Sequence, residues 1–275
     1  MSLREKLFNT LAPFQPALHN KINFNHVDLY YWKPTKSGLN FGDHLSSIIV
    51  NKILGDNGHM LEEETAETKK LFAVGSVLHF AKDGDVVWGS GVNGKIVSSE
   101  HTFKNLDVRA VRGPLTRDFL MQRGIKVPEV YGDPALLLPT IFPDRFVKTH
   151  EKPYVIVPNL HDLGIAVKNK WNHIISPLSS WNKCITEILK ARLVIASSLH
   201  GIIIAEAFGI PAIYIRITET ENLFKYNDYT MGTGRGEISY STSLNEALEM
   251  GGMAPPVFDP QKLINAFPID LWRKF

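Results

Sequence analysis

A histidine lies among small polar residues inside an otherwise apolar stretch of the chain. The segment ASSLHGIIIAEAFGIP (residues 196–211) places Ser197, Ser198, His200 and Gly201 between two apolar runs. An imidazole can give or take a proton near neutral pH, and the positive end of a helix favours a nearby anion while opposing protonation of the ring. Gly201 allows a ligand or a facing backbone to approach closely. We predict that Ser198 caps a helix and that His200, in its first turn, is an acid–base group.

Charged side chains elsewhere could serve the same site. Arg112 follows the apolar segment VRAV, where the end of a strand would carry it into a cleft, and a guanidinium can hold a carboxylate or phosphate through two hydrogen bonds. Glu206 either reaches the cleft, orients another group or pairs with an arginine. In the loop SGLNFGDH, Gly42 permits a tight turn and Asp43 can cap the next helix, which leaves Asn40 free to point into the cleft.

Two glycine-rich turns follow later apolar segments. They are GSVLH, with Gly75 and Ser76, and GSGVNG, with Ser90, Gly91 and Asn93. Such turns expose backbone N–H groups that can bind an anion. Neither is a Walker loop, and GSGVNG lacks the long helix and the acidic residue of a dinucleotide-binding fingerprint. Tight turns without a ligand are an equally good interpretation.

Short apolar runs alternate with helical patterns around these residues, which predicts parallel sheets in an α/β fold. The helix expected over residues 43–54 has an apolar face at helical spacing, and Pro114 and Gly124 mark the ends of another. Expected strands are residues 27–32, 70–74, 85–89, 108–112, 128–132, 154–158, 173–176, 193–197 and 212–216; further helices are residues 181–191, 200–208 and 260–273.

A proline-rich, charged segment at residues 139–153 lacks any period and is interpreted as a linker. We therefore predict two Rossmann-like domains, residues 1–145 and 150–275, facing a cleft, with the last helix packing back on the body. Ligands of such sheets bind beyond the carboxyl ends of the strands, where the candidate residues lie.

Composition narrows the class of protein. The net charge of the 275 residues is +2, so charge gives no support for nucleic-acid binding. Cys184 is the single cysteine, which excludes an intrachain disulfide and a cysteine-rich metal site. No signal peptide or membrane-spanning run is found, and a cytoplasmic location is expected. The first residues form either a docked terminal helix or an amphipathic helix that touches a membrane.

The order of several short motifs resembles the polysaccharide pyruvyl transferase family, closest to its bacterial exopolysaccharide group. NFGD, GSVL, WGSGV, RAVRGPLTRDFL, YGDPALLLP, SSLHGIIIAEAFGIP and KYNDY occur in this order between about residues 40 and 229. The resemblance implies a GT-B-like fold, phosphoenolpyruvate as donor and a sugar as acceptor. The implied product is a pyruvate ketal that bridges two hydroxyls, with phosphate released and no metal or organic cofactor needed.

The resemblance also implies roles for the candidate residues. Arg112 would bind the donor carboxylate or phosphate, His200 would act as acid or base, and Asn40 and Asp43 would lie near the acceptor. Many family members carry arginine where this chain has Ser198, and Arg112, Arg216 or Arg235 could supply the missing charge. The acceptor could be lipid-linked, at the inner face of the membrane, nucleotide-linked or polymeric.

Two other functions remain open at this point. A GT-B glycosyltransferase would bind a nucleotide sugar in its C-terminal half. A non-catalytic glycan-binding protein would bind the acceptor without releasing phosphate, and the Ser198 departure favours it. The glycine-rich segment at residues 224–237 is predicted to be a mobile loop bordering the cleft.

Overall fold

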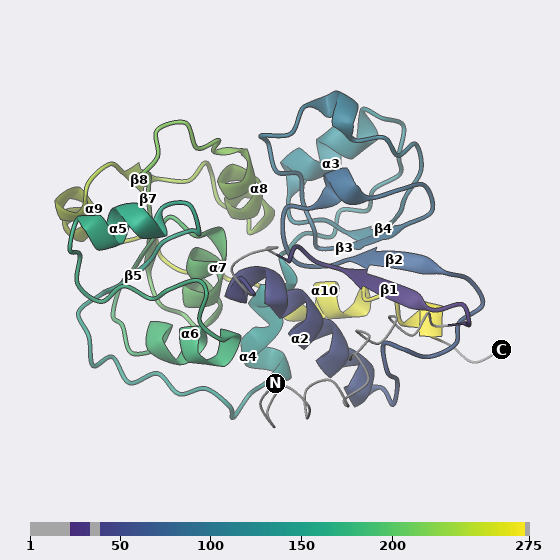
Figure 1. Cartoon of the computed structure of the whole chain (residues 1–275), viewed down its shortest axis with the longest axis horizontal. Coiled ribbons are helices and arrows are strands. Elements are labelled where there is room, and N and C mark those ends of the chain that lie inside the picture. The colour runs from purple at the N-terminus through teal and green to yellow at the C-terminus, as the bar shows by residue number, and fades with distance from the viewer. Residues whose placement is uncertain (1–22, 34–38, 273–275) are drawn as a thin grey trace, which may run out of the picture.

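The protein contains two parallel sheets of four strands each, consistent with two Rossmann-like units (Figure 1). This computed structural model describes residues 23–33 and 39–272. Hydrogen-bonded neighbours follow the order β1-β2-β3-β4 in one sheet and β5-β6-β7-β8 in the other. The N-terminal helix expected before residue 15 and the last residue of the helix expected over 260–273 lie outside the described residues. Parallel strands in sequential order explain why apolar runs and helical patterns alternate along the chain.

The N-terminal sheet carries helix α2 after its first strand. In register, Leu29 of β1 lies beside Leu71 of β2, which lies beside Val86 of β3. A bulge between Val87 and Trp88 shifts the pairing with β4. The elements are β1 (Val27–Tyr30), α2 (Phe41–Asp56), β2 (Lys69–Phe72), η1 (Leu78–Phe80), β3 (Val86–Trp88), η2 (Ser98–Glu100), β4 (Asp107–Ala110), α3 (Pro114–Met121) and η3 (Pro134–Leu137).

The C-terminal sheet has strands that are buried on both faces, because helices cover it on either side. Such strands read as continuous apolar runs, which is why the sequence located three of them well. The elements are α4 (Leu138–Ile141), β5 (Val155–Val157), α5 (Leu163–Lys168), α6 (Trp181–Ile188), β6 (Val194–Ala196), α7 (Leu199–Ala207), β7 (Ala212–Ile215), α8 (Phe224–Gly232), β8 (Tyr240–Ser241), α9 (Leu244–Met250), α10 (Pro260–Asn265) and η4 (Ile269–Trp272).

Four local predictions were wrong. The helix expected over residues 260–273 is broken: α10 ends at Asn265, and a separate 3-10 helix, η4, begins at Ile269 after Pro268. The segments predicted as strands at residues 128–132 and 173–176 make single bridges, through Tyr131 and Ile174, because each leaves its neighbouring strand after one pair. The segment predicted as a mobile loop forms helix α8. Its glycines suggested a loop, but Tyr226 and Tyr229 are buried at helical spacing, and the glycines follow the buried turns.

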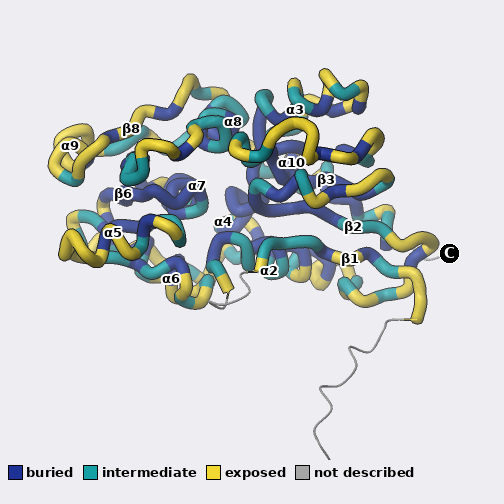
Figure 2. Tube along the Cα trace, turned by 45° about the horizontal axis from the view of Figure 1, so that its top comes forward, coloured by how far each residue is buried: buried dark blue, intermediate teal, exposed yellow. Residues whose placement is uncertain are grey.

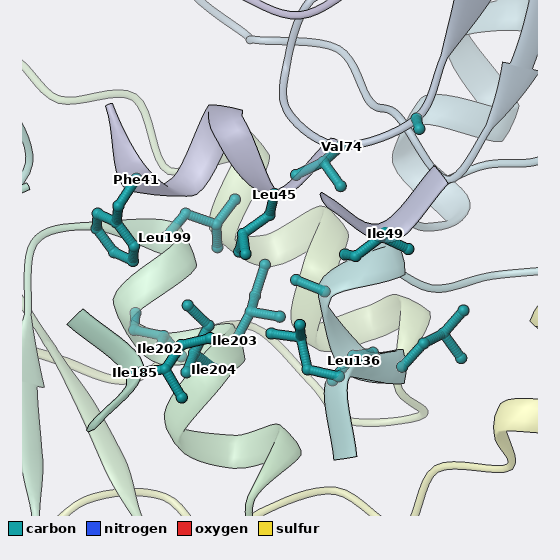
Figure 3. Packing of buried hydrophobic residues seen from close by; sticks show 14 of the residues in the cluster. Phe41, Leu45, Ile49, Val74, Leu136, Ile185, Leu199, Ile202, Ile203 and Ile204 are labelled. Atoms are coloured by element: carbon teal, nitrogen blue, oxygen red, sulfur yellow. The ribbon is translucent and has the colours of Figure 1, made fainter. Parts of the chain in front are cut away.

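The two units share one hydrophobic core rather than meeting across open solvent. Phe41, Leu45 and Ile49 of α2 pack with Leu199 and the isoleucines of α7 in one cluster of buried side chains (Figure 3). Buried residues gather in the interior of both units, and exposed residues lie mainly at the periphery (Figure 2). The relative placement of the sheets is therefore fixed by α2 and α7, which both pack against η3, α4 and α6 and whose starts carry predicted site residues.

The end of the chain packs against the N-terminal unit. Trp88 of β3 donates its indole N–H to the carbonyl of Leu263 in α10 at 2.9 Å, and its ring meets Phe267 edge-on at 4.9 Å. Arg109 of β4 forms two hydrogen bonds of 2.8 Å with Asp270. Helix α10 and the residues after it, which follow the second sheet in sequence, thus pack against the first sheet (Figure 1).

Candidate functional site

A pocket of about 340 Å³ lies where the carboxyl ends of strands from both sheets meet. Its lining comes from the loops after β1, β2, β3 and β5 and from the starts of α2, α7 and α8. Parallel α/β sheets bind ligands at this edge. Among the predicted site residues, Asn40, Asp43, Ser76, Asn93, Ser198 and His200 line it.

Helix α2 presents a carboxyl group to the pocket. Asn40 is its N-cap and accepts a hydrogen bond from the N–H of Gly42 at 3.0 Å, so Asn40 takes the capping role predicted for Asp43. Asp43 instead lies in the first turn. Burial raises the pKa of Asp43 to about 7, against the opposing effect of the Lys225 charge, and the nearby Asp133 raises it further. This carboxyl group can therefore hold a proton at neutral pH.

Helix α7 presents the predicted histidine from the other unit. Ser198 is its N-cap and accepts a hydrogen bond from the N–H of Gly201 at 3.3 Å, as predicted. Burial lowers the pKa of His200 to about 3, and the charges of Arg112 and Lys225 lower it further. The imidazole is therefore neutral at physiological pH, and one of its ring nitrogens can accept a hydrogen bond.

His200 lies between the start of α2 and a buried carboxylate. Its Nε2 is 3.9 Å from Oδ2 of Asp133, and both atoms are buried without a hydrogen-bond partner among the described residues. Burial raises the pKa of Asp133 to about 6. On the opposite edge, a Cβ added to Gly42 would lie 2.2 Å from Nδ1 of His200. Glycine at this position is what allows the ring to pack against α2.

Arg112 does not line the pocket. The side chain is fully buried, with Nε 3.0 Å from Oδ2 of Asp228, Nη1 2.5 Å from Oγ of Ser76 and Nη2 2.7 Å from the carbonyl of Val92. Asp228 lies on α8, so this ion pair joins the end of β4 to the C-terminal part of the chain. The charge of Arg112 acts on the pocket from behind Ser76 rather than by direct contact.

The two glycine-rich turns are joined by hydrogen bonds. The N–H of Gly91 and the hydroxyl of Ser90 both donate to the carbonyl of Gly75, at 3.1 and 2.9 Å. Gly91 also packs on Arg112, since an added Cβ would lie 2.4 Å from the guanidinium carbon. These contacts leave the side chains of Ser76 and Asn93 at the pocket surface.

The remaining predicted residues lie outside the pocket lining. Glu206 pairs with Arg235 through two bonds of 2.7 Å and accepts from Tyr229 at 2.6 Å, which matches the alternative that it pairs with an arginine. Arg216 donates to the carbonyls of residues 219 and 221. Ser197 accepts a hydrogen bond from the N–H of Asn159 at 3.0 Å.

The sequence analysis missed the cation that reaches the pocket. Lys225, in the first turn of α8, lines the pocket and pairs with Glu221 at 2.8 Å; Glu221 also pairs with Lys95 of the N-terminal unit. The KYNDY motif contains Lys225, but the segment was predicted to be a mobile loop, and Lys225 was therefore not proposed as a site residue. Asn159 and His161 also line the pocket, and their position directly after β5 was the signal that could have found them.

The geometry combines a proton donor, a proton acceptor and features that favour an anion. Two helices direct their positive ends at one pocket that also holds Lys225. Across residues 23–33 and 39–272, no group of three or more His, Cys, Asp or Glu side chains could hold a metal ion. In the same part of the chain, no helix is long and apolar enough to cross a bilayer.

Comparisons with known proteins agree with this description. The model of the polysaccharide pyruvyl transferase family matches residues 40–218, more than half of the chain. The succinoglycan biosynthesis protein ExoV of Rhizobium meliloti (strain 1021) is 28% identical over 218 residues, which cover 74% of this chain and 64% of that protein. The chain thus spans less than two thirds of the length of this relative.

Two more distant matches add little about function. The uncharacterised protein L143 of Acanthamoeba polyphaga mimivirus is 23% identical over 236 residues, covering 78% of this chain and 79% of that protein. The solved structure of KP1_0663, a functionally uncharacterised protein of Klebsiella pneumoniae subsp. pneumoniae NTUH-K2044, has 13% identity and a TM-score of 0.50. It covers 88% of this chain and all of that one, and at this identity it shows a shared fold alone.

Proposed function

The chain belongs to the polysaccharide pyruvyl transferase family, and we propose that its pocket transfers the pyruvyl group of phosphoenolpyruvate to two hydroxyls of a sugar. The products are a cyclic pyruvate ketal and inorganic phosphate. The observation that carries the proposal is the meeting of two helix starts and Lys225 at one pocket that also holds Asp43 and His200. An anionic donor and acid–base chemistry need these groups together.

The donor binds at the two helix starts. Phosphoenolpyruvate carries a carboxylate and a phosphate and has few protons to donate, so its site needs cations and N–H groups. Lys225 supplies the charge, and the hydroxyl of Ser198 and the N–H groups of the first turn of α7 supply hydrogen bonds. Since Lys225 lines the pocket with Ser198, it takes the place of the arginine that many family members carry there. The positive charge of Arg112, which lies behind Ser76, also attracts the anionic donor.

Asp43 is the candidate acid and His200 the candidate base. A proton passes from Asp43 to the methylene carbon, which becomes a methyl group and leaves the adjacent carbon electron-poor. One sugar hydroxyl forms a C–O bond to that carbon and gives its proton to neutral His200. The C–O bond to phosphate then breaks, and His200 passes its proton to the departing phosphate. A second hydroxyl closes the ring and gives its proton to the Asp43 carboxylate, which restores the starting protonation of both side chains.

The acceptor is a sugar of a surface polysaccharide or its precursor. The printed name of ExoV places that relative in succinoglycan biosynthesis, which supports a role for this chain in exopolysaccharide biosynthesis. We retain the GT-B-like arrangement, with residues 1–145 as the acceptor side and part of the donor site and residues 150–275 as the donor side.

Calorimetric titration with phosphoenolpyruvate tests the donor site. We expect the wild-type chain to bind it and Lys225→Met to bind at least about tenfold more weakly, because a charged hydrogen bond is worth about 1.5–3 kcal/mol. Lys95→Met is the matched control: Lys95 also pairs with Glu221, yet it does not line the pocket. Equal loss in both variants would mean that the effect comes from unpairing Glu221.

Phosphate release with a panel of sugar acceptors then tests the transfer itself. Release that depends on both phosphoenolpyruvate and an acceptor supports the proposal. A chain that binds uridine or guanosine diphosphate sugars and not phosphoenolpyruvate is a glycosyltransferase, and one that binds only glycans is a binding protein.

A further inference from the structure

The pocket has a second wall that differs from the helix starts in its chemistry. Trp32 and Phe80 line the N-terminal side, together with His79 and Asn93. Phe80 is 41% exposed, so part of its ring is accessible to a ligand. None of these side chains is positively charged at neutral pH, so this wall offers little to a phosphate.

The aromatic surface is held rigidly in place. The ring of Phe80 lies 5.1 Å from that of Tyr30, and Tyr30 stacks on buried Phe72 at the same distance. On its other side, Phe80 contacts the ring of His79 at 4.0 Å between centroids. A row of stacked rings thus runs from the core to the pocket edge, and it presents a fixed apolar face to a ligand.

Two hydrogen-bonding atoms beside this face have no partner among the described residues. They are Nδ1 of His79 and Oδ1 of Asn93, and both are buried. Burial lowers the pKa of His79, which keeps its ring neutral. An amide oxygen needs a donor, and a buried polar atom without one costs free energy. Phosphoenolpyruvate carries few donors, whereas a sugar carries one on every hydroxyl.

We propose that this wall is the acceptor subsite and that it takes a pyranose ring, stacked on Phe80 and Trp32 with hydroxyls bonded to Asn93 and His79. Sugar rings have apolar C–H faces and a polar rim of hydroxyls, which match an aromatic surface bordered by an amide and an imidazole. The ring then lies across the pocket from the helix starts, with Asp43 and His200 between donor and acceptor. As an acceptor site this assignment rests on the proposed function, but the binding of sugar is measured without turnover.

The test is saturation-transfer NMR of the full chain with methyl glycosides of glucose, galactose and mannose and with glucose- and galactose-containing oligosaccharides. We expect at least one to bind. Its affinity should fall about tenfold or more in Phe80→Ala and in Trp32→Ala, and also in Phe80→Leu, which keeps apolar volume but removes the aromatic face. Asn93→Leu, which removes the amide oxygen, should weaken binding as well.

Phe24→Ala is the matched control, because Phe24 is 39% exposed and does not line the pocket. It should bind sugar as the wild type does, and all the variants should keep their affinity for phosphoenolpyruvate. The proposal is overturned if no glycan of the panel binds, if Phe80→Leu binds unchanged, or if uridine or guanosine monophosphate is what these variants lose. Sugar binding without phosphoenolpyruvate binding would contradict the proposed function and leave the subsite standing.

Discussion

Helices α2 and α7 meet at the pocket with similar starts and opposite chemistry. Each is capped by a small polar side chain, Asn40 in one and Ser198 in the other, and each carries an ionisable residue in its first turn. On α2 that residue is an acid whose pKa burial raises to about 7. On α7 it is a base whose pKa burial lowers to about 3.

The difference shows which physical effect dominates. A helix start should lower the pKa of both residues, because it favours negative charge. Asp43 moves the other way, so desolvation outweighs the helix dipole there. Both side chains are therefore held close to their neutral forms at physiological pH. The pocket keeps its positive potential for an incoming anion, while a carboxyl group that can hold a proton and a neutral imidazole lie in the same space.

Removing the base should have the largest effect. We expect His200→Ala to lower kcat about 100- to 10,000-fold, the usual contribution of general acid–base catalysis. Thermal unfolding should show that the fold persists. His59→Ala, outside the pocket, is the control and should retain wild-type turnover. Wild-type turnover in His200→Ala would remove this residue from the mechanism.

Removing the acid on α2 should change the pH dependence of turnover, which distinguishes its role from that of His200 on α7. Asp43 donates only while protonated, so wild-type kcat/KM, which reports the free enzyme, should fall as the pH rises through about 7. Asp43→Asn should lower kcat about 100-fold and should lack this decline, because the amide does not titrate. A variant that keeps the same decline above pH 7 would assign the titration to another group. Rates of phosphate release between pH 5 and 9 make the measurement.

The contact between the two helices can be disturbed without touching either ionisable group. A Cβ at Gly42 would overlap the His200 ring, so Gly42→Ala should displace it and lower kcat about tenfold or more. Gly55→Ala, in the same helix with open space around it, is the matched control. It should keep its activity and gain about 0.5–1 kcal/mol of stability. Equal activity in both variants would show that the ring adjusts freely.

The caps should give the smallest effects. Asn40→Ala and Ser198→Ala each lose one hydrogen bond to a helix start, which costs about 1 kcal/mol of unfolding free energy. Urea denaturation measures this loss. Since the side chains also line the pocket, each variant should bind phosphoenolpyruvate more weakly, Ser198→Ala more so because it lies on the donor side. Undiminished binding in Ser198→Ala would argue against that placement.

Local sequence patterns predicted the helix starts at the pocket but not the long-range side-chain pairs around it. The helix starts, the strands around them and His200 could be located because apolar periodicity and capping residues act over a few positions. The ion-pair partners of these residues could not be located in this way. Asp228 lies 116 residues after Arg112, and nothing local indicates that these two would neutralise each other. Arg112 was therefore expected to be free for a ligand, and Lys225 was overlooked.

The buried pair of Arg112 and Asp228 limits how chimeras of this family can be built. Exchanging the N-terminal half of the chain at the segment between the sheets would transplant Arg112 without the helix that neutralises it. An unmatched α8 would leave a buried charge unpaired, at a cost of about 3–5 kcal/mol. Close packing sharpens the restriction, because a Cβ at Gly232 would lie 2.3 Å from the carbonyl oxygen of Arg112. A graft of the first sheet therefore has to bring α8 along with it.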